Sequence, residues 1–197
     1  MAARLVSVAS ALCLAVAGVQ GGRGAWIFAK AEAAQVLLHR AWEQARSGED
    51  RPRPWPWADS WPVARIILPG GDHIVLAGAS GRTLAFAPGH LDGSAAPGAD
   101  GACVIAGHRD THFAELEDLA VGDRVVLEDA SGHRHVYRVT STAVVDEHDI
   151  SVLEQGATPT LVLVTCWPFH AVSEGGPLRY VVRAEIVKTL HVRTLER

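Results

Sequence analysis

The chain has 197 residues, of which 48% are hydrophobic and 20% are charged, and its formal net charge is -4 with an isoelectric point of about 6.2. This much apolar material can form a core, which excludes wholesale disorder, and the length fits one domain with an appendage. The charge balance gives no clustered basic surface, so we expect no nucleic-acid partner.

The N-terminus contains an uncharged apolar run, LVSVASALCLAVAG, over residues 5–18, with Arg4 ahead of it. Two interpretations stay open. One is a cleaved signal peptide with a basic start and a small-residue exit. The other is an uncleaved membrane anchor over residues 1–28, which becomes long enough to span a bilayer if the segment 21–28 is included and Arg23 lies near the interface. We expect the anchor, and either interpretation means that the rest of the chain is exported.

Residues 29–62 are expected to form a helix followed by an arm. Small and aliphatic side chains recur at helical spacing over residues 31–45. Residues 47–62, SGEDRPRPWPWADSWP, contain four prolines, which exclude a continuous helix or strand. Three tryptophans in the same segment predict that the arm packs onto the following domain rather than hanging free.

Residues 63–197 are predicted to form an all-β domain. Short runs rich in Val, Ile and Leu alternate with Gly, Pro and Asp clusters, which is the pattern of short strands separated by turns. Eight such strands with little helix between them indicate a closed or nearly closed barrel, with one short helical turn near residues 114–119. The strands are expected at Val63–Leu68, His73–Ala77, Leu84–Ala87, Cys103–Gly107, Arg124–Glu128, His135–Val145, Thr160–Thr165 and Arg179–Val187.

The segment TLVLVTCWPF, residues 160–169, places a cysteine at the end of an apolar strand. Pro168 prevents the strand from continuing, so Cys166 should lie at the barrel rim, beside a turn-rich loop that runs to residue 178. Three cysteines in the whole chain do not make a disulfide framework. The local pattern alone leaves two interpretations open, an inert buried cysteine or a nucleophile that needs a neighbouring base.

Two other segments could supply partners for a nucleophile. The segment AGHRDTHF follows the apolar run CVIAG, so His108 also lies just past the end of a strand. The segment GGPLRYVVRAEIV begins a strand on which Arg179 and Arg183 share one face. Either guanidinium could stabilise a negatively charged oxygen, and the local pattern does not separate them.

No metal or cofactor is expected. His108 and His112 are four residues apart, which suits a metal only on a helix, whereas a turn is predicted here. Glu115, Glu117 and Asp118 form an acidic patch that is most simply a solvated turn.

A histidine after one strand, a TLxTC-like strand end and an arginine on the next strand, in that order, resemble the sortase family. The resemblance spans about residues 60–190, and the CWPF, GHRDTHF and GGPLRY segments are most similar to the subgroup found in Gram-negative proteobacteria. One position departs from the family pattern, because Val162 stands where a threonine is usual. The fold implied is a closed eight-stranded sortase-like β-barrel with short helical turns, preceded by an N-terminal helix or membrane anchor.

The resemblance also implies a role for each site residue. Cys166 would be the nucleophile and His108 the general acid and base. Arg179 would be the clamp for the oxyanion and the substrate, because it lies at the start of its strand. Thr165 would contact the substrate backbone.

The implied activity is that of a cysteine transpeptidase. Its partners would be an exported protein with an LPxTG-like C-terminal sorting signal, held as a thioester after cleavage, and an amine acceptor. The implied location is the cell membrane, single-pass, with the catalytic domain on the extracytoplasmic side. Two rivals stay open: a thiol hydrolase that releases the acyl group to water, and a non-catalytic, membrane-tethered barrel that binds peptides.

Overall fold

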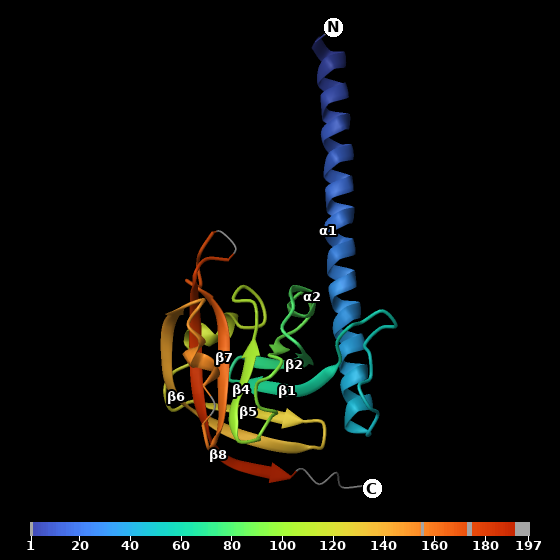
Figure 1. Cartoon of the computed structure of the whole chain (residues 1–197). Helices are drawn as coiled ribbons and strands as arrows, with labels where there is room; N and C mark the ends of the chain where they lie inside the picture. Colours follow the sequence, from blue (N-terminus) through green and yellow to red (C-terminus); the bar gives the residue numbers. More distant parts are fainter. Residues whose placement is uncertain (1, 155, 173–174, 192–197) are drawn as a thin grey trace. The chain divides into compact units, whose positions relative to one another are not determined.

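The computed structural model describes residues 2–154, 156–172 and 175–191 (Figure 1). The chain divides into two compact units, Met1–Leu37 and Leu38–Arg197. Helix α1, Ala2–Arg46, contains the helix predicted over residues 31–45. Its last turns belong to the second unit, where the indole of Trp42 and the side chain of Ala45 pack against Ile74.

The predicted membrane anchor lies at the start of α1. Among the described residues, no helix is both long enough and apolar enough to cross a membrane. The side chains of residues 2–16 lie outside the description, and they include most of the apolar run. The anchor therefore stays a prediction.

The second unit contains a closed barrel of eight strands, which confirms the predicted fold. Around the barrel the strands follow the order β1-β2-β3-β4-β7-β8-β6-β5. Two short 3-10 helices, η1 at Ala114–Asp118 and η2 at Ile150–Leu153, interrupt the connections, and η1 is the helical turn expected from the sequence. The strands are β1 Pro62–Leu68, β2 Gly71–Ala77, β3 Gly89–His90, β4 Gly101–Ala106, β5 Arg124–Asp129, β6 His133–Asp146, β7 Pro159–Trp167 and β8 Leu178–His191.

One predicted strand is wrong and another was missed. The predicted strand over residues 84–87 is instead the end of helix α2, Gly81–Leu84, and the turn after it. The Ser80 side chain caps that helix by accepting a hydrogen bond from the backbone N–H of Thr83. The missed strand is β3, which pairs in parallel with β2 and antiparallel with β4. Its first residue has to be small, since a Cβ on Gly89 would collide with the backbone carbonyl of Gly78. Two residues are too few to show an alternating pattern.

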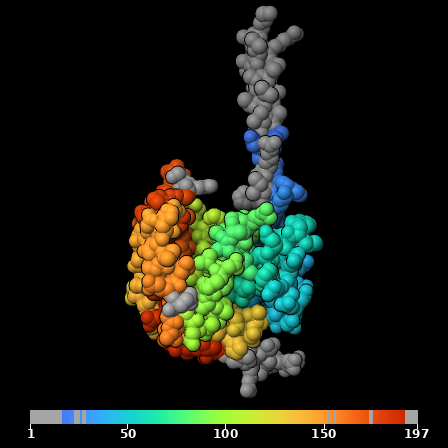
Figure 2. Space-filling view, viewed as in Figure 1, coloured from blue at the N-terminus to red at the C-terminus, as the bar shows by residue number. Residues whose placement is uncertain are grey.

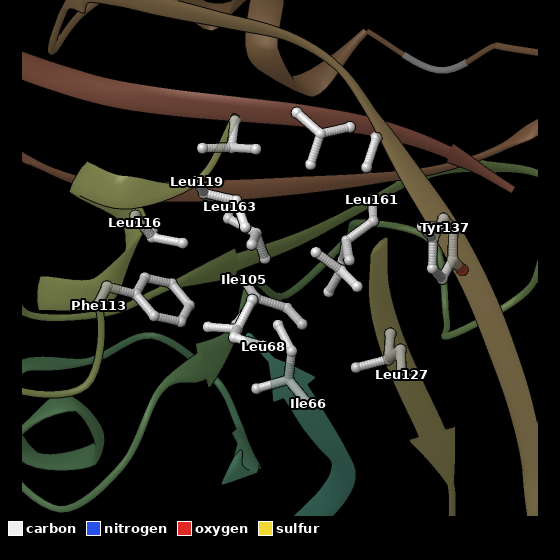
Figure 3. Packing of buried hydrophobic residues seen from close by; sticks show 14 of the residues in the cluster. Ile66, Leu68, Ile105, Phe113, Leu116, Leu119, Leu127, Tyr137, Leu161 and Leu163 are labelled. Carbon is white, nitrogen blue, oxygen red and sulfur yellow. The ribbon is translucent and has the colours of Figure 1, made fainter. Parts of the chain in front are cut away.

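The barrel interior is filled by aliphatic side chains from all around the sheet. Leu161 and Leu163 of β7 and Ile105 of β4 are each 0% exposed, and they meet side chains from β1, β5 and β6 (Figure 3). Strand residues alternate between the two faces of a sheet. Because Leu161 and Leu163 point inward, Cys166 on the same strand belongs to the outer face.

The outer face of β4, β7 and β8 carries a second apolar cluster. Ala102, Val104, Val162 and Val181 are buried there, and Leu91 and Val145 pack against them from flanking segments. In Figure 2, the green surface around residues 90–105 lies beside the orange surface around residues 145–165. This part of the outer face is therefore covered, and Cys166 lies at its end.

The arm over residues 47–61 is irregular, as its prolines predict. Pro52, Pro54, Ala58 and Ser60 are buried. The ring of Trp55 meets that of Phe86 edge-on, with centroids 4.7 Å apart. The guanidinium of Arg51 lies 4.9 Å above Trp61. The packing expected of the three tryptophans fails for Trp57, which is 82% exposed.

Candidate active site

Three adjacent strands bring the predicted site residues to one edge of the barrel. Strands β4 and β7 are parallel, so their carboxyl ends lie at the same edge, and β8 is antiparallel to β7, so it begins there. His108 follows β4, Cys166 lies near the end of β7, and Arg179 lies at the start of β8. The strand order, rather than the sequence order, makes them neighbours.

Cys166 and Arg179 lie directly opposite each other. They are paired in the antiparallel register of β7 and β8, and directly paired residues point to the same face of a sheet. Arg183 pairs with Val162 instead. Since a strand advances about 3.3 Å per residue, Arg183 is about 13 Å further along the strand than Arg179. The register thus separates the two arginines that the sequence pattern could not.

The guanidinium of Arg179 is held by a carboxylate that the sequence did not single out. Its Nη2 donates to Oε2 of Glu147 at 2.6 Å, and its Nη1 donates to the carbonyl oxygen of Gly176 at 2.6 Å. The backbone N–H of Glu147 in turn donates to the carbonyl of Pro177 at 2.6 Å. Arg179 is 32 residues away from Glu147 in the chain, so no local pattern pointed to this pair.

The parallel pairing of β4 and β7 directs His108 to the same edge of the barrel as Cys166. Ala106 pairs with Val164, and the N–H of Gly107 donates to the carbonyl of Val164 at 3.1 Å. Continuing this register by two residues along both strands would bring His108 next to Cys166. The carbonyl of His108 accepts a hydrogen bond from the N–H of Phe113 at 3.0 Å, which closes the following turn, and the His108 side chain is exposed.

The Thr165 side chain points into the barrel, whereas that of Cys166 points to the outer face. It is 2% exposed, and its hydroxyl donates to the carbonyl of Gly107 at 2.7 Å. The hydroxyl therefore ties the residue before Cys166 to the residue before His108. The expected contact of Thr165 with a substrate backbone stays a prediction.

Arg109, next to the predicted site residue His108, is a buried arginine that the sequence pattern did not single out. It is 4% exposed although it immediately follows the exposed His108. Its Nη1 donates to the carbonyl of Pro168 at 2.8 Å, its Nη2 to the carbonyl of Ala171 at 3.2 Å, and its Nε to Oδ1 of Asp110 at 3.2 Å. Charged residues are ordinarily exposed, so nothing in the sequence pattern indicated this burial.

Cys103 and Cys166 are both free thiols, but they occupy different faces of the barrel. Cys103 of β4 is 1% exposed in the interior cluster, and burial raises the pKa of its thiol from 9.0 to about 12. Since the thiolate is the reactive form, Cys103 is chemically inert. Cys166 is partly exposed on the outer face and is the thiol that a substrate can reach.

His73 contacts two residues that follow His108 in the chain, His112 and Glu115. Nε2 of His73 lies 2.7 Å from Oε1 of Glu115, and the ring of His73 meets that of His112 edge-on at a centroid distance of 5.8 Å. Burial, and then repulsion from His73 and His108, lowers the pKa of His112 from 6.5 to about 4. His112 is therefore neutral at pH 7. The acidic patch of the sequence is in part paired with histidines, because Oε1 of Glu117 also lies 3.1 Å from Nε2 of His170.

The sequence and the fold both match known proteins. The family model described as the sortase domain matches residues 68–187. Sortase D of Bacillus subtilis (strain 168) is 36% identical over 95 residues, which cover 48% of this chain and 47% of that protein. The chain thus matches about half the length of this curated relative.

Two solved structures illustrate the likeness in fold. A sortase D5 transpeptidase of Clostridium perfringens superposes with a TM-score of 0.64 at 23% identity, covering 80% of this chain and 99% of that one. Sortase E of Streptomyces avermitilis superposes with a TM-score of 0.56 at 27% identity, covering 66% of this chain and 90% of that one.

The lowered pKa of His112 predicts that the domain loses stability in mild acid. In the unfolded chain, the His112 side chain takes up a proton near pH 6.5. In the folded chain, it stays neutral until the pH falls to about 4. The free energy of unfolding should therefore fall as the pH drops from 6.5 to 4. The contribution of His112 is on the order of 1–3 kcal/mol, since one pKa unit is worth about 1.4 kcal/mol.

Urea unfolding of the wild type and of His112→Gln at pH 7.5, 5.5 and 4.5 measures this contribution. The variant should lose less stability than the wild type across the series. His39→Gln, which removes an exposed histidine from α1, is the matched control and should follow the wild type. Parallel losses in His112→Gln and the wild type would contradict the assignment.

Proposed function

Because the chain belongs to the sortase family, we propose that it is a cysteine transpeptidase whose nucleophile is Cys166. The proposed substrate is an exported protein with an LPxTG-like C-terminal sorting signal. The proposed second substrate is an amine, to which the enzyme transfers the acyl part. No metal or cofactor takes part in this scheme.

One observation supports the proposal: an accessible cysteine, a histidine and an arginine lie at the ends of three adjacent strands, at the same edge of the barrel. Cys166 is paired with Arg179 across β7 and β8, and His108 follows β4, whose end lies at the same edge as the end of β7. A thiol nucleophile needs a group that exchanges protons and a positive group where negative charge develops. His108 and Arg179 are of the types that supply these two functions.

The first half of the reaction forms the thioester. The Cys166 thiol gives its proton to His108, and the resulting thiolate attacks the carbonyl carbon of the threonine in the sorting signal. Negative charge then develops on the carbonyl oxygen. The guanidinium of Arg179, with its several fixed N–H donors, stabilises that oxygen. The C–N bond then breaks, and His108 delivers a proton to the departing amine.

The second half transfers the acyl group. The nitrogen of the acceptor amine attacks the thioester carbonyl and gives its proton to His108. Arg179 again faces the negative oxygen. The C–S bond breaks, the new amide leaves, and Cys166 returns to its starting state.

Glu147 has a part in this scheme as the resting partner of Arg179. The pair is partly exposed, with 27% of the Arg179 side chain and 38% of the Glu147 side chain accessible. Exposed ion pairs are typically worth only about 0–1 kcal/mol, so the guanidinium can exchange Glu147 for a substrate oxygen at little cost. Glu147 holds the side chain near the site until the substrate arrives.

The location of the enzyme belongs to the same proposal. The N-terminal segment over residues 1–28 would anchor the chain in the cell membrane, with the barrel on the extracytoplasmic side. The apolar run over residues 5–18 supports this placement. The similarity to the proteobacterial subgroup also stays a prediction.

The test of this function is peptide cleavage and transfer by two cysteine variants. Cys166→Ala should lose all cleavage of an LPxTG-type peptide, because no other described thiol lies on the outer face at the site. Cys103→Ala is the matched control and should keep most of its activity, since its thiol is buried and inert.

Liquid chromatography with mass spectrometry measures both products, the hydrolysed acid and the amide formed with an added amine. The wild type should favour the amide as the amine concentration rises. Cleavage that persists in Cys166→Ala would remove the nucleophile from the scheme, and release to water alone at every amine concentration would make the protein a hydrolase.

A second prediction ranks the two arginines of β8. Arg179→Ala should lower kcat/KM by about 10²- to 10³-fold, the usual cost of removing an oxyanion donor. Arg183→Ala should stay within about threefold of the wild type, because Arg183 pairs with Val162 rather than with Cys166. Steady-state kinetics on the same peptide measure both effects, and the opposite ranking would assign the clamp to Arg183.

A further inference from the structure

A buried arginine lies between the two reactive segments and needs an explanation. Only 3% of the Arg109 side chain is accessible, and a buried guanidinium loses its hydration. Its carboxylate partner, Asp110, is 61% accessible, and solvent weakens such a pair. The ion pair with Asp110 therefore contributes little to stability, and it does not explain why an arginine is buried at position 109.

The hydrogen bonds of Arg109 suggest a different reason. Its Nη1 and Nη2 reach the carbonyls of Pro168 and Ala171, which are 59 and 62 residues further along the chain. The same two residues are joined by a turn, in which the N–H of Ala171 donates to the carbonyl of Pro168 at 3.3 Å. One planar side chain thus binds the turn that directly follows the Cys166 strand.

This contact is one of the hydrogen bonds that join the segment around His108 to the segment around Cys166. On one side, the hydroxyl of Thr165 donates to the carbonyl of Gly107. On the other side, Arg109 donates to the carbonyl of Pro168. The residues before and after His108 are therefore bound to segments before and after Cys166.

We propose that Arg109 is a positioning residue that holds His108 beside the Cys166 thiol. This inference rests on the proposed roles of His108 and Cys166. Arg109 touches neither the substrate nor the reacting atoms in this scheme. It acts through the backbone, because a shift of the turn at Pro168 relative to Arg109 would change the separation of the histidine and the thiol.

The chemistry of arginine suits this task better than that of lysine. A guanidinium has five N–H donors in a planar fork, so it can bind two carbonyls and a carboxylate at once in a fixed geometry. A lysine ammonium in the same place keeps the charge but is a compact group on a flexible stem. Misplacement of a catalytic group by about 1 Å can cost about 10²-fold in rate. Arg109→Lys therefore separates geometry from charge.

The experiment compares Arg109→Lys with Arg138→Lys in the full chain. Arg138 is the matched control, because it is an exposed arginine of β6 whose Nη1 also donates to a backbone carbonyl, that of Gly122. Near-ultraviolet circular dichroism and thermal unfolding establish that each variant is folded. Two activities are then measured: turnover of an LPxTG-type peptide, and alkylation of Cys166 by iodoacetamide from pH 5 to 9.

Arg109→Lys should lower kcat at least about tenfold, with KM changed less than about threefold. The pH dependence of its Cys166 alkylation should move towards that of His108→Ala, since the imidazole no longer sits beside the thiol. In a His108→Ala background, Arg109→Lys should leave the alkylation rate unchanged. Arg138→Lys should match the wild type in both measurements.

A folded Arg109→Lys that keeps the wild-type kcat would overturn the proposal. A loss of kcat with the wild-type alkylation profile would also overturn it, because the role would then be structural only. If Arg109→Lys does not fold, Asp110→Asn replaces it, since Asp110 is largely exposed and its loss loosens Arg109. Asp110→Asn should shift the alkylation profile in the same direction, and an unchanged profile would contradict the proposal.

The proposed function and the positioning role of Arg109 fail in different ways. If the wild type does not cleave the peptide but Arg109→Lys still changes the alkylation profile, the proposed substrate is wrong and the positioning role stands. If the wild type cleaves the peptide and Arg109→Lys behaves like the wild type, the proposed function stands and the positioning role is wrong.

Discussion

The site depends on the bonds that join the end of β4 to the end of β7. The N–H of Gly107 donates to the carbonyl of Val164, and the hydroxyl of Thr165 donates back to the carbonyl of Gly107. These two bonds extend the parallel pairing by one step beyond the last paired residues of the strands' shared register. They hold the segments that follow the two strands together at the edge where His108 and Cys166 lie. A Cβ on Gly107 would lie 2.7 Å from the ring of Phe113, so the residue before His108 must be small.

The barrel also determines which cysteine can react. Strand residues alternate between the two faces, so Cys103 and Cys166 meet different surroundings although β4 and β7 are neighbours. Inside, Cys103 packs among aliphatic side chains and stays protonated. Outside, Cys166 lies at the end of the covered apolar face, opposite Arg179. The alternation of side chains between the two faces of the sheet thus makes Cys103 a packing residue and leaves Cys166 as the candidate nucleophile.

Much of the fold could be predicted from the sequence, because most strands are long enough to show their pattern. The run ending at Cys166 predicted β7, whereas the two residues of β3 carry no readable pattern. The inward direction of Thr165 follows from the alternation once Cys166 is placed outside, so this signal was present in the sequence. The burial of Arg109 and the pairing of Arg179 with Glu147 could not be predicted, because both depend on contacts between segments far apart in the chain.

The central claim is that Cys166 carries the acyl group, and intact-mass spectrometry after acid quenching tests it most directly. Incubation with an LPxTG-type peptide and no added amine should add the mass of the acyl part to the protein. Peptide mapping should place that mass on Cys166, and hydroxylamine should remove it, as expected for a thioester. An adduct on any other residue, or turnover without a hydroxylamine-sensitive adduct, would contradict the account.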